Sequence, residues 1–156
     1  MNEIRFYDPR EGEFCGLSNL HPRPLEFEGK RYATPEHAYQ VLKARPALRA
    51  WLMAAPTPEL VAVAGDALTA EQTMDHWQDT HVGIMTRIVR AKFEQHPDLR
   101  ALLLATDTAR LVEWSPEDSE VAKLWGEYLG RGQNLLGKML MCLRHEYREG
   151  RSSTAP

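Results

Sequence analysis

The stretch Thr34-Pro-Glu-His-Ala-Tyr-Gln-Val-Leu-Lys-Ala44 decides the fold, because it joins a strong helix start to a polar helical face. Thr34 is a capping residue type, Pro35 suits the first helical position, and Glu36 falls in the first turn. Polar side chains at offsets zero, three, four and seven share one face, namely Glu36, Tyr39, Gln40 and Lys43. The other side is apolar and is expected to be buried: Ala38, Val41, Leu42, Ala44 and Leu48.

The polar face also has a simpler interpretation as solvated surface. A Glu in the first turn is favoured by the positive end of the helix dipole, whatever its function. A Lys two turns later can simply extend into water, as most polar helix faces do. Spacing alone therefore leaves a catalytic face and a solvated face both open.

Composition places the chain among ordinary globular proteins. The 156 residues suffice for one domain with a core, and the hydrophobic fraction of 43% and charged fraction of 26% are typical. The net charge of -3 gives no overall basic footprint for nucleic acid. The isolated Cys15 and Cys142 predict free thiols in a reducing, cytoplasmic compartment. No ligand spacing, membrane-length apolar run or signal peptide is evident, so we expect no metal and no membrane association.

Working outward, the sequence predicts short strands before the key helix and more helices after it. A strand at 4–7 precedes a hairpin with strands at 25–27 and 30–32 around a Glu28-Gly29 turn. Further helices are predicted at 47–54, 57–64, 75–95, 97–104 and 135–149, with a strand at 110–114. Residues 65–74 and most of 115–134 are predicted to be loops.

Several polar and aromatic residues outside this helix are candidates for ligand binding. Ser18, Asn19 and Asn134 lie beside glycine or in loops and could hydrogen-bond a sugar or amide, although loop Asn is commonly a turn residue. Trp77 and Trp125 could stack on a base, or could belong to the core. The Gly130-x-Gly132 pair lacks the third glycine of a dinucleotide fingerprint.

Taken together, the motifs resemble a known family. They recur in the family's order over about residues 4–147: Phe6-Tyr7, Leu17-Ser-Asn-Leu20, Thr34-Pro-Glu-His-Ala-Tyr-Gln40, Lys43, Ala91-Lys-Phe93, Leu111-Val-Glu113, Trp125-Gly126, Gly132-Gln-Asn-Leu-Leu-Gly137 and Leu140-Met141. The chain is similar to YbiA-like members of the NADAR superfamily. That resemblance implies an α+β, mainly α fold, a compact single-domain helical array with a small β-sheet. We assign residues 1–149 to this domain and 150–156 to a flexible tail.

The resemblance also implies hydrolysis of an N-glycosidic bond to ribose without a cofactor. Two substrate classes are associated with the family: ADP-ribose on guanine, in a nucleotide or in nucleic acid, and phosphoribosylamino intermediates of riboflavin biosynthesis. The matched positions give Glu36 and Lys43 as catalytic residues. The matched positions for substrate binding are Ser18, Asn19, Tyr39, Trp77, Trp125, Gly126 and Asn134. One departure is that the family's Trp-Glu-x-x-Lys run reads Trp77-Gln-Asp-Thr-His81 here, which puts the role of that ion pair in doubt.

The chemistry is consistent with these assignments. Cleavage of a ribosyl N-glycoside builds positive charge at C1′, which a fixed carboxylate can stabilise. We expect Glu36 to stay ionised at its helix N-terminus and to act as a base or electrostatic stabiliser. Lys43 could donate a hydrogen bond or form an imine with a ring-opened sugar. Arg5, Arg31 or Arg131 would meet an anionic ligand end. A non-catalytic ADP-ribose or nucleotide-binding module, and a structural partner-binding domain, are the alternatives.

Overall fold

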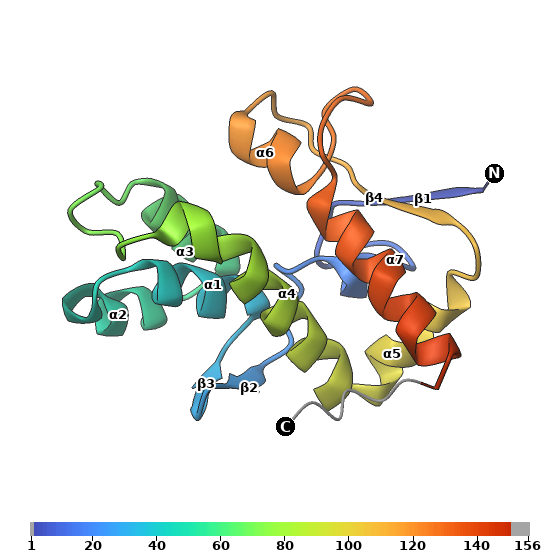
Figure 1. Ribbon diagram of the computed structural model, residues 1–156, viewed down its shortest axis with the longest axis horizontal. Coiled ribbons are helices and arrows are strands. Elements are labelled where there is room, and N and C mark those ends of the chain that lie inside the picture. Colours follow the sequence, from blue (N-terminus) through green and yellow to red (C-terminus); the bar gives the residue numbers. More distant parts are fainter. Residues whose placement is uncertain (1, 151–156) are drawn as a thin grey trace. The chain divides into compact units, whose positions relative to one another are not determined.

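The computed structural model describes residues 2–150, in which short strands accompany a larger set of helices (Figure 1). Within these residues, the predicted α+β, mainly α class is confirmed. The chain divides into two compact units: an insert unit, residues 19–95, and a terminal unit, residues 2–18 together with 96–150. No helix within the described range is long and apolar enough to cross a membrane.

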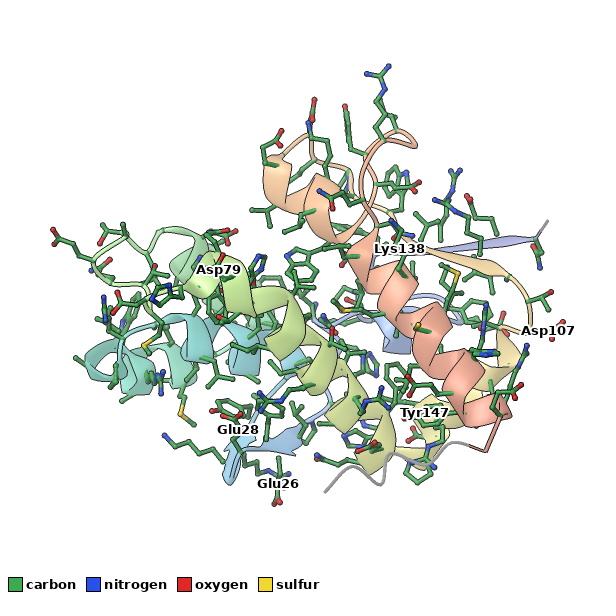
Figure 2. The ribbon with its side chains drawn as sticks, in the orientation of Figure 1. Glu26, Glu28, Asp79, Asp107, Lys138 and Tyr147 are labelled. Atoms are coloured by element: carbon green, nitrogen blue, oxygen red, sulfur yellow. The ribbon has the colours of Figure 1, made fainter. Side chains whose placement is uncertain are left out.

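The insert unit begins with a hairpin, β2 (Leu25–Phe27) and β3 (Lys30–Tyr32), paired antiparallel as predicted. Glu28 and Gly29 make the two-residue turn with φ of 50° and 76°, the left-handed values that a tight hairpin requires. Figure 2 labels Glu26 and Glu28 on this hairpin, and the Glu28 carboxylate pairs with the guanidinium of Arg87. Four helices follow: α1 (Pro35–Lys43), α2 (Pro46–Met53), α3 (Pro58–Asp66) and α4 (Trp77–Gln95).

Helix α1 is the centre of the insert unit, since it contacts α2, α3 and α4. The predicted apolar side is buried at Ala38, Val41 and Ala44, each fully inaccessible. Tyr39 and Gln40 on the polar face are also buried, so this face is not solvated surface. Helix α4 adds Met85, Ile88, Val89 and Phe93 to the same core.

The terminal unit combines residues 2–18 with residues 96–150. Strand β1 (Glu3–Phe6) lies parallel to β4 (Arg110–Glu113), with Glu3 opposite Arg110. Around them are the short 3-10 helix η1 (Cys15–Leu17) and helices α5 (Pro97–Ala105), α6 (Glu120–Trp125) and α7 (Leu135–Arg148).

Two contacts of α7 hold the terminal unit together. The buried Arg144 guanidinium on this helix donates to the Thr106 hydroxyl at 2.7 Å and to the Ala109 carbonyl at 2.9 Å. Arg148 pairs with Asp107 at 2.9 Å, and Asp107 is labelled in Figure 2 at the turn that follows α5. The end of α5 is therefore tied to α7 by charged hydrogen bonds.

Some predicted boundaries are wrong. Helix α3 continues through Gly65 and Asp66, beyond its predicted end at residue 64. Helix α6, capped by Ser119, lies inside the predicted 115–134 loop. The four strands form two separate pairs rather than one N-terminal sheet, because β4 joins β1. The predicted start of α4 at residue 75 is also too early, because the helix begins at Trp77. Asp75 pairs with Arg45 at 2.9 Å, and His76 has a left-handed φ of 59°.

The assignment of residues 1–149 to one domain and 150–156 to a flexible tail stays a prediction. Gly150 is the last residue that the structure describes, so residues 151–156 of the predicted tail lie outside the described range.

Candidate active site

The start of α1 is fixed by two residues of the sequence motif, Thr34 and His37, which have a structural role. The Thr34 hydroxyl accepts from the His37 backbone N–H at 3.2 Å, which caps the helix. The buried His37 ring lies 2.8 Å from that hydroxyl at Nδ1 and 2.9 Å from the Ala55 carbonyl at Nε2. Because a carbonyl only accepts, Nε2 carries the ring proton and Nδ1 accepts from Thr34. His37 therefore anchors α1 to the end of α2.

Glu36 sits one residue before this anchor, with its backbone N–H donating to the Asn19 carbonyl at 3.2 Å. The residue is half-buried, and its carboxyl is surrounded by protein. Gln40 Nε2 donates to Glu36 Oε1 at 2.8 Å. Burial raises the Glu36 pKa to about 7, while the Gln40 hydrogen bond lowers it and the Asp66 charge raises it further.

The expectation that Glu36 stays fully ionised is therefore wrong. The helix dipole favours the carboxylate, but loss of water around a buried carboxyl is the larger effect. A carboxyl with a pKa of about 7 exchanges protons readily at neutral pH, so Glu36 is suited to both acid and base roles.

Lys43 lies two turns along on the same face, and its ammonium is held in place by α3. Nζ donates to the Gly65 carbonyl at 2.7 Å, at the negative end of that helix. The Lys43 carbonyl accepts from Met74 N–H at 2.8 Å, so the loop between α3 and α4 is bound to the end of α1. The Arg45–Asp75 ion pair reinforces the same attachment.

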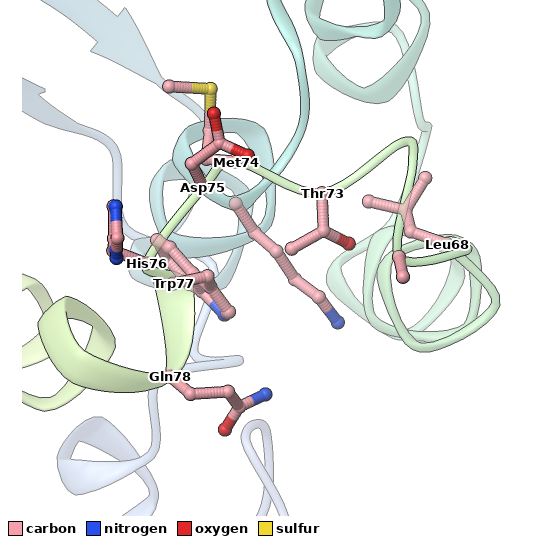
Figure 3. A pocket seen from close by; sticks show the side chains of 9 residues that line it. Leu68, Thr73, Met74, Asp75, His76, Trp77 and Gln78 are labelled. Atoms are coloured by element: carbon pink, nitrogen blue, oxygen red, sulfur yellow. The ribbon is translucent and has the colours of Figure 1, made fainter.

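This loop and helix end line an open cavity of about 480 Å³, large enough for a nucleotide-sized ligand. Figure 3 shows Thr73, Trp77 and Gln78 around it, with Leu68 farther along the loop. Two of the predicted site residues, Lys43 and Trp77, line the same cavity. The full lining comprises Lys43, Leu68, Ala70, Thr73, Met74, Asp75, His76, Trp77 and Gln78.

A buried aromatic group, of which Trp77 lines the cavity, comprises Tyr39, Trp77 and His81. The Tyr39 and Trp77 ring centroids are 5.1 Å apart, and the Tyr39 hydroxyl lies 3.2 Å from His81 Nδ1. Burial raises the pKa of Tyr39, and burial together with the Lys43 charge lowers the pKa of His81. Both are therefore neutral at pH 7 and share this hydrogen bond. Of the two positions that depart from the family's charged run, His81 thus bonds Tyr39, and Gln78 lines the cavity.

Asn19 follows η1 and contributes both its backbone and its side chain to the insert unit. Its carbonyl accepts from Glu36, and its Nδ2 approaches Met85 Sδ at 3.2 Å. Within residues 2–150, Asn19 Oδ1 is buried without a hydrogen-bond partner. A buried amide oxygen of this kind has a free acceptor for a ligand or water.

The other predicted substrate-binding residues belong to the terminal unit. Ser18 is buried at the end of η1, and Trp125 is half-buried at the end of α6. A Cβ on Gly126 would meet the Glu113 carbonyl at 2.1 Å, so only glycine fits there. Asn134, with φ of 50°, donates from Nδ2 to the Leu111 carbonyl at 2.8 Å and accepts at Oδ1 from Glu113 N–H at 3.2 Å. Its amide thus fastens α7 to β4.

Within the insert unit, Asn19 bonds the Glu36 backbone and Tyr39 packs against Trp77. Of the predicted residues, Lys43 and Trp77 line the cavity. Gly126 and Asn134 meet within the terminal unit, where the Asn134 N–H donates to the Gly126 carbonyl at 3.1 Å. That all these residues share one cleft stays a prediction, as do the anion contacts of Arg5, Arg31 and Arg131. Arg5 pairs with Glu3 at 2.6 Å. Among residues 2–150, no three His, Cys, Asp or Glu side chains gather as a metal site would require.

Sequence reasoning missed two residues of α3 that act on this site. Gly65 bonds Lys43, and the Asp66 charge acts on both Glu36 and Lys43. The available signal was the Thr57-Pro58 helix start, because a helix counted from it at average length runs past Ala64.

Comparison with known proteins identifies the chain's relatives. The model of the NADAR domain matches residues 5–148. N-glycosidase YbiA of Escherichia coli (strain K12) is 34% identical over 151 residues, spanning 92% of this chain and 87% of the relative. N-glycosidase Npun_R5314 of Nostoc punctiforme is 37% identical over 150 residues, spanning 93% and 92%.

A riboflavin biosynthesis protein, VVA0006 of Vibrio vulnificus, is 34% identical over 155 residues, which is 94% of this chain and 39% of the relative. The NMR structure of E. coli YbiA matches with a TM-score of 0.83 at 32% identity, covering 99% of this chain and 90% of that one. The resemblance drawn from the motifs is confirmed.

Proposed function

We propose that this chain, which belongs to the NADAR family, is an N-glycosidase that hydrolyses a bond between ribose C1′ and nitrogen. The observation that carries the proposal is that Glu36, whose carboxyl is surrounded by protein and has a pKa of about 7, shares one face of α1 with Lys43. A passive binding pocket has no need of a buried carboxyl that exchanges protons at neutral pH. The names of relatives that are 34% and 37% identical support the same reaction class.

In the proposed reaction, the C1′–N bond breaks and its electron pair goes to the nitrogen. Positive charge then builds on C1′ and the ring oxygen, where the ionised Glu36 stabilises it. A water oxygen bonds to C1′ and gives its proton to the Glu36 carboxylate. The Lys43 ammonium donates a hydrogen bond to the leaving group or to a sugar oxygen. The leaving nitrogen takes up one proton from solvent, and Glu36 returns the water-derived proton to solvent.

The substrate we favour is ADP-ribose attached to guanine. In support, the cavity has an aromatic wall at Trp77 and polar groups at Thr73 and Gln78, which suits a ribosyl base. A second candidate is a phosphoribosylamino intermediate of riboflavin biosynthesis. It is favoured by the 34% identity to the Vibrio vulnificus riboflavin biosynthesis protein.

The test is to incubate the protein separately with ADP-ribosyl-guanine DNA and with a phosphoribosylaminouracil, and to follow release of the ribose end. We expect hydrolysis of the first, with Glu36→Gln lowering kcat by about 10²–10⁴-fold. Substrate binding should survive in this variant, since the ground state carries no cation at C1′.

The matched control is Glu71→Gln, the same change at an exposed carboxylate of the loop before α4. It should leave kcat unchanged. Full activity of Glu36→Gln would leave a non-catalytic nucleotide-binding module as the better interpretation. Preferential hydrolysis of the phosphoribosylaminouracil would select the second candidate.

A further inference from the structure

Gly65, on the last turn of α3, contacts Lys43 and Gln40 through different atoms, and Gln40 is the hydrogen-bond partner of Glu36. Its carbonyl accepts from Lys43 Nζ at 2.7 Å. Its Cα faces the Gln40 carboxamide so closely that a Cβ built there would lie 1.8 Å from Gln40 Oε1, 2.3 Å from Cδ and 2.9 Å from Cγ. The space that other residues fill with a side chain is therefore occupied by Gln40.

Gln40 has little freedom to move away. It is buried on α1, with only 2% of its surface exposed. Its Nε2 donates to Glu36 Oε1 at 2.8 Å, and within residues 2–150 its Oε1 has no hydrogen-bond partner. An unpaired buried oxygen is costly, so hydrogen bonding by Oε1 does not fix the orientation of the Gln40 amide. Its packing against Gly65 and its bond to Glu36 fix it instead.

We propose that Gly65 is a positioning residue for the active-site pair, because its missing side chain leaves room for the Gln40 amide that holds Glu36. This inference rests on the proposed function, in which Glu36 and Lys43 carry the reaction. The substrate does not touch Gly65 in this proposal; the glycine acts through Gln40 on the carboxyl and through its carbonyl on the ammonium.

The first variant is Gly65→Ala. The new methyl group displaces the Gln40 amide, and Glu36 loses the one side-chain donor that lowers its pKa. The Gly65 carbonyl is retained, so the Lys43 contact has no direct reason to change. We expect kcat to fall about 10- to 100-fold, as for a small misplacement of a catalytic group.

A carboxyl ¹³C NMR titration of Glu36 provides a readout that does not need turnover. The Glu36 pKa should rise above its native value of about 7 in Gly65→Ala. The charged groups that also act on Glu36, Lys43 on α1 and Asp66 on α3, are unchanged in this variant. If the chain lacks N-glycosidase activity, the titration still decides the positioning role, and the two failures are told apart.

Gln40→Ala supplies the second arm, because it removes the three atoms that a methyl group at position 65 would meet. It should reproduce the pKa rise and the loss of kcat. Adding Gly65→Ala to Gln40→Ala should then change kcat by no more than about twofold and should leave the Glu36 pKa where Gln40→Ala put it, since the effects of coupled residues are not additive.

Gly83→Ala is the matched control, because a Cβ at this exposed glycine of α4 meets nothing within 4 Å. It should leave kcat and the Glu36 titration unchanged. An unchanged Glu36 titration in Gly65→Ala overturns the proposal. So does a fall in kcat from Gly65→Ala that is equally large in the native protein and in the Gln40→Ala background. If Gly65→Ala does not fold, a folded double variant supports the proposal, and a double variant that also fails to fold overturns it.

Discussion

Burial of the Glu36 carboxyl links the protonation of one residue to the stability of the fold. Its pKa is about 4.5 when unfolded and about 7 when folded, so the native state holds the proton more tightly. The free energy of unfolding therefore falls as pH rises from about 4.5 to about 7. Glu36→Gln removes this loss while keeping the shape of the side chain.

We accordingly expect Glu36→Gln to be more stable than the native protein at pH 8, by on the order of 2 kcal/mol, with a much smaller difference at pH 5. Urea unfolding at both pH values measures it. The exposed Glu71→Gln should show no such pH dependence, and a gap that is widest at pH 5 would contradict the assigned direction.

Lys43 carries a prediction of its own. Lys43→Ala removes the ammonium from the cavity and should lower kcat about 10²-fold, the usual contribution of one positioned acid–base group. Borohydride added during turnover then separates the two roles left open by the sequence. A covalent adduct at Lys43 shows imine formation, whereas its absence together with partial activity of Lys43→Arg shows hydrogen-bond donation. Native kcat in Lys43→Ala would remove the residue from the reaction.

Spacing predicted that these two residues share a helical face, and the family resemblance made them candidates for catalysis, but the sequence could not predict the state of Glu36. Helical offsets depend only on the backbone period, so the shared face was evident. The pKa depends on desolvation, and that follows from Gln40 and α3 packing around the carboxyl. Long-range packing of this kind has no local sequence signal.

Among the elements, α1 depends on a cap with two functions. The Thr34 hydroxyl accepts from the His37 backbone and also bonds its buried ring, whereas the equivalent Thr57 of α3 only accepts from Leu60 N–H at 3.2 Å. Thr34→Ala should therefore cost about 2 kcal/mol of unfolding free energy and Thr57→Ala about 1 kcal/mol. Thermal unfolding of both variants tests this. Equal losses would show that the His37 ring bond contributes nothing.

The elements that the sequence predicted well have local causes. The Glu28-Gly29 turn defines its hairpin because both residues take left-handed backbone values, and Thr34-Pro35 defines the start of α1. Helix α6 was missed because its six residues are too few for a periodic signal. The end of α3 was missed because glycine commonly stops a helix. Gly65 instead lies inside α3, at a position where a side chain would collide with Gln40.

For the whole molecule, charge balance bears on the nucleic-acid question. With 19 basic and 22 acidic residues, the chain lacks the positive excess that drives sequence-independent binding to duplex DNA. We expect no tight binding of unmodified duplex DNA at about 150 mM salt, measured by fluorescence anisotropy. An ADP-ribosylated duplex of the same sequence is the comparison. Submicromolar binding of the plain duplex would contradict this expectation.

The parallel pairing of β1 with β4 has a consequence for how the chain is made. Strand β1 leaves the ribosome before β4, which begins with Arg110, 107 residues after Glu3. At about 5–20 residues per second, β1 waits about 5–20 s for β4. Residues 19–95 are contiguous, so the insert unit can assemble during that interval. The Glu36–Lys43 pair can thus be in place before β1 meets β4, and the loop between these strands is then already shortened by a folded unit.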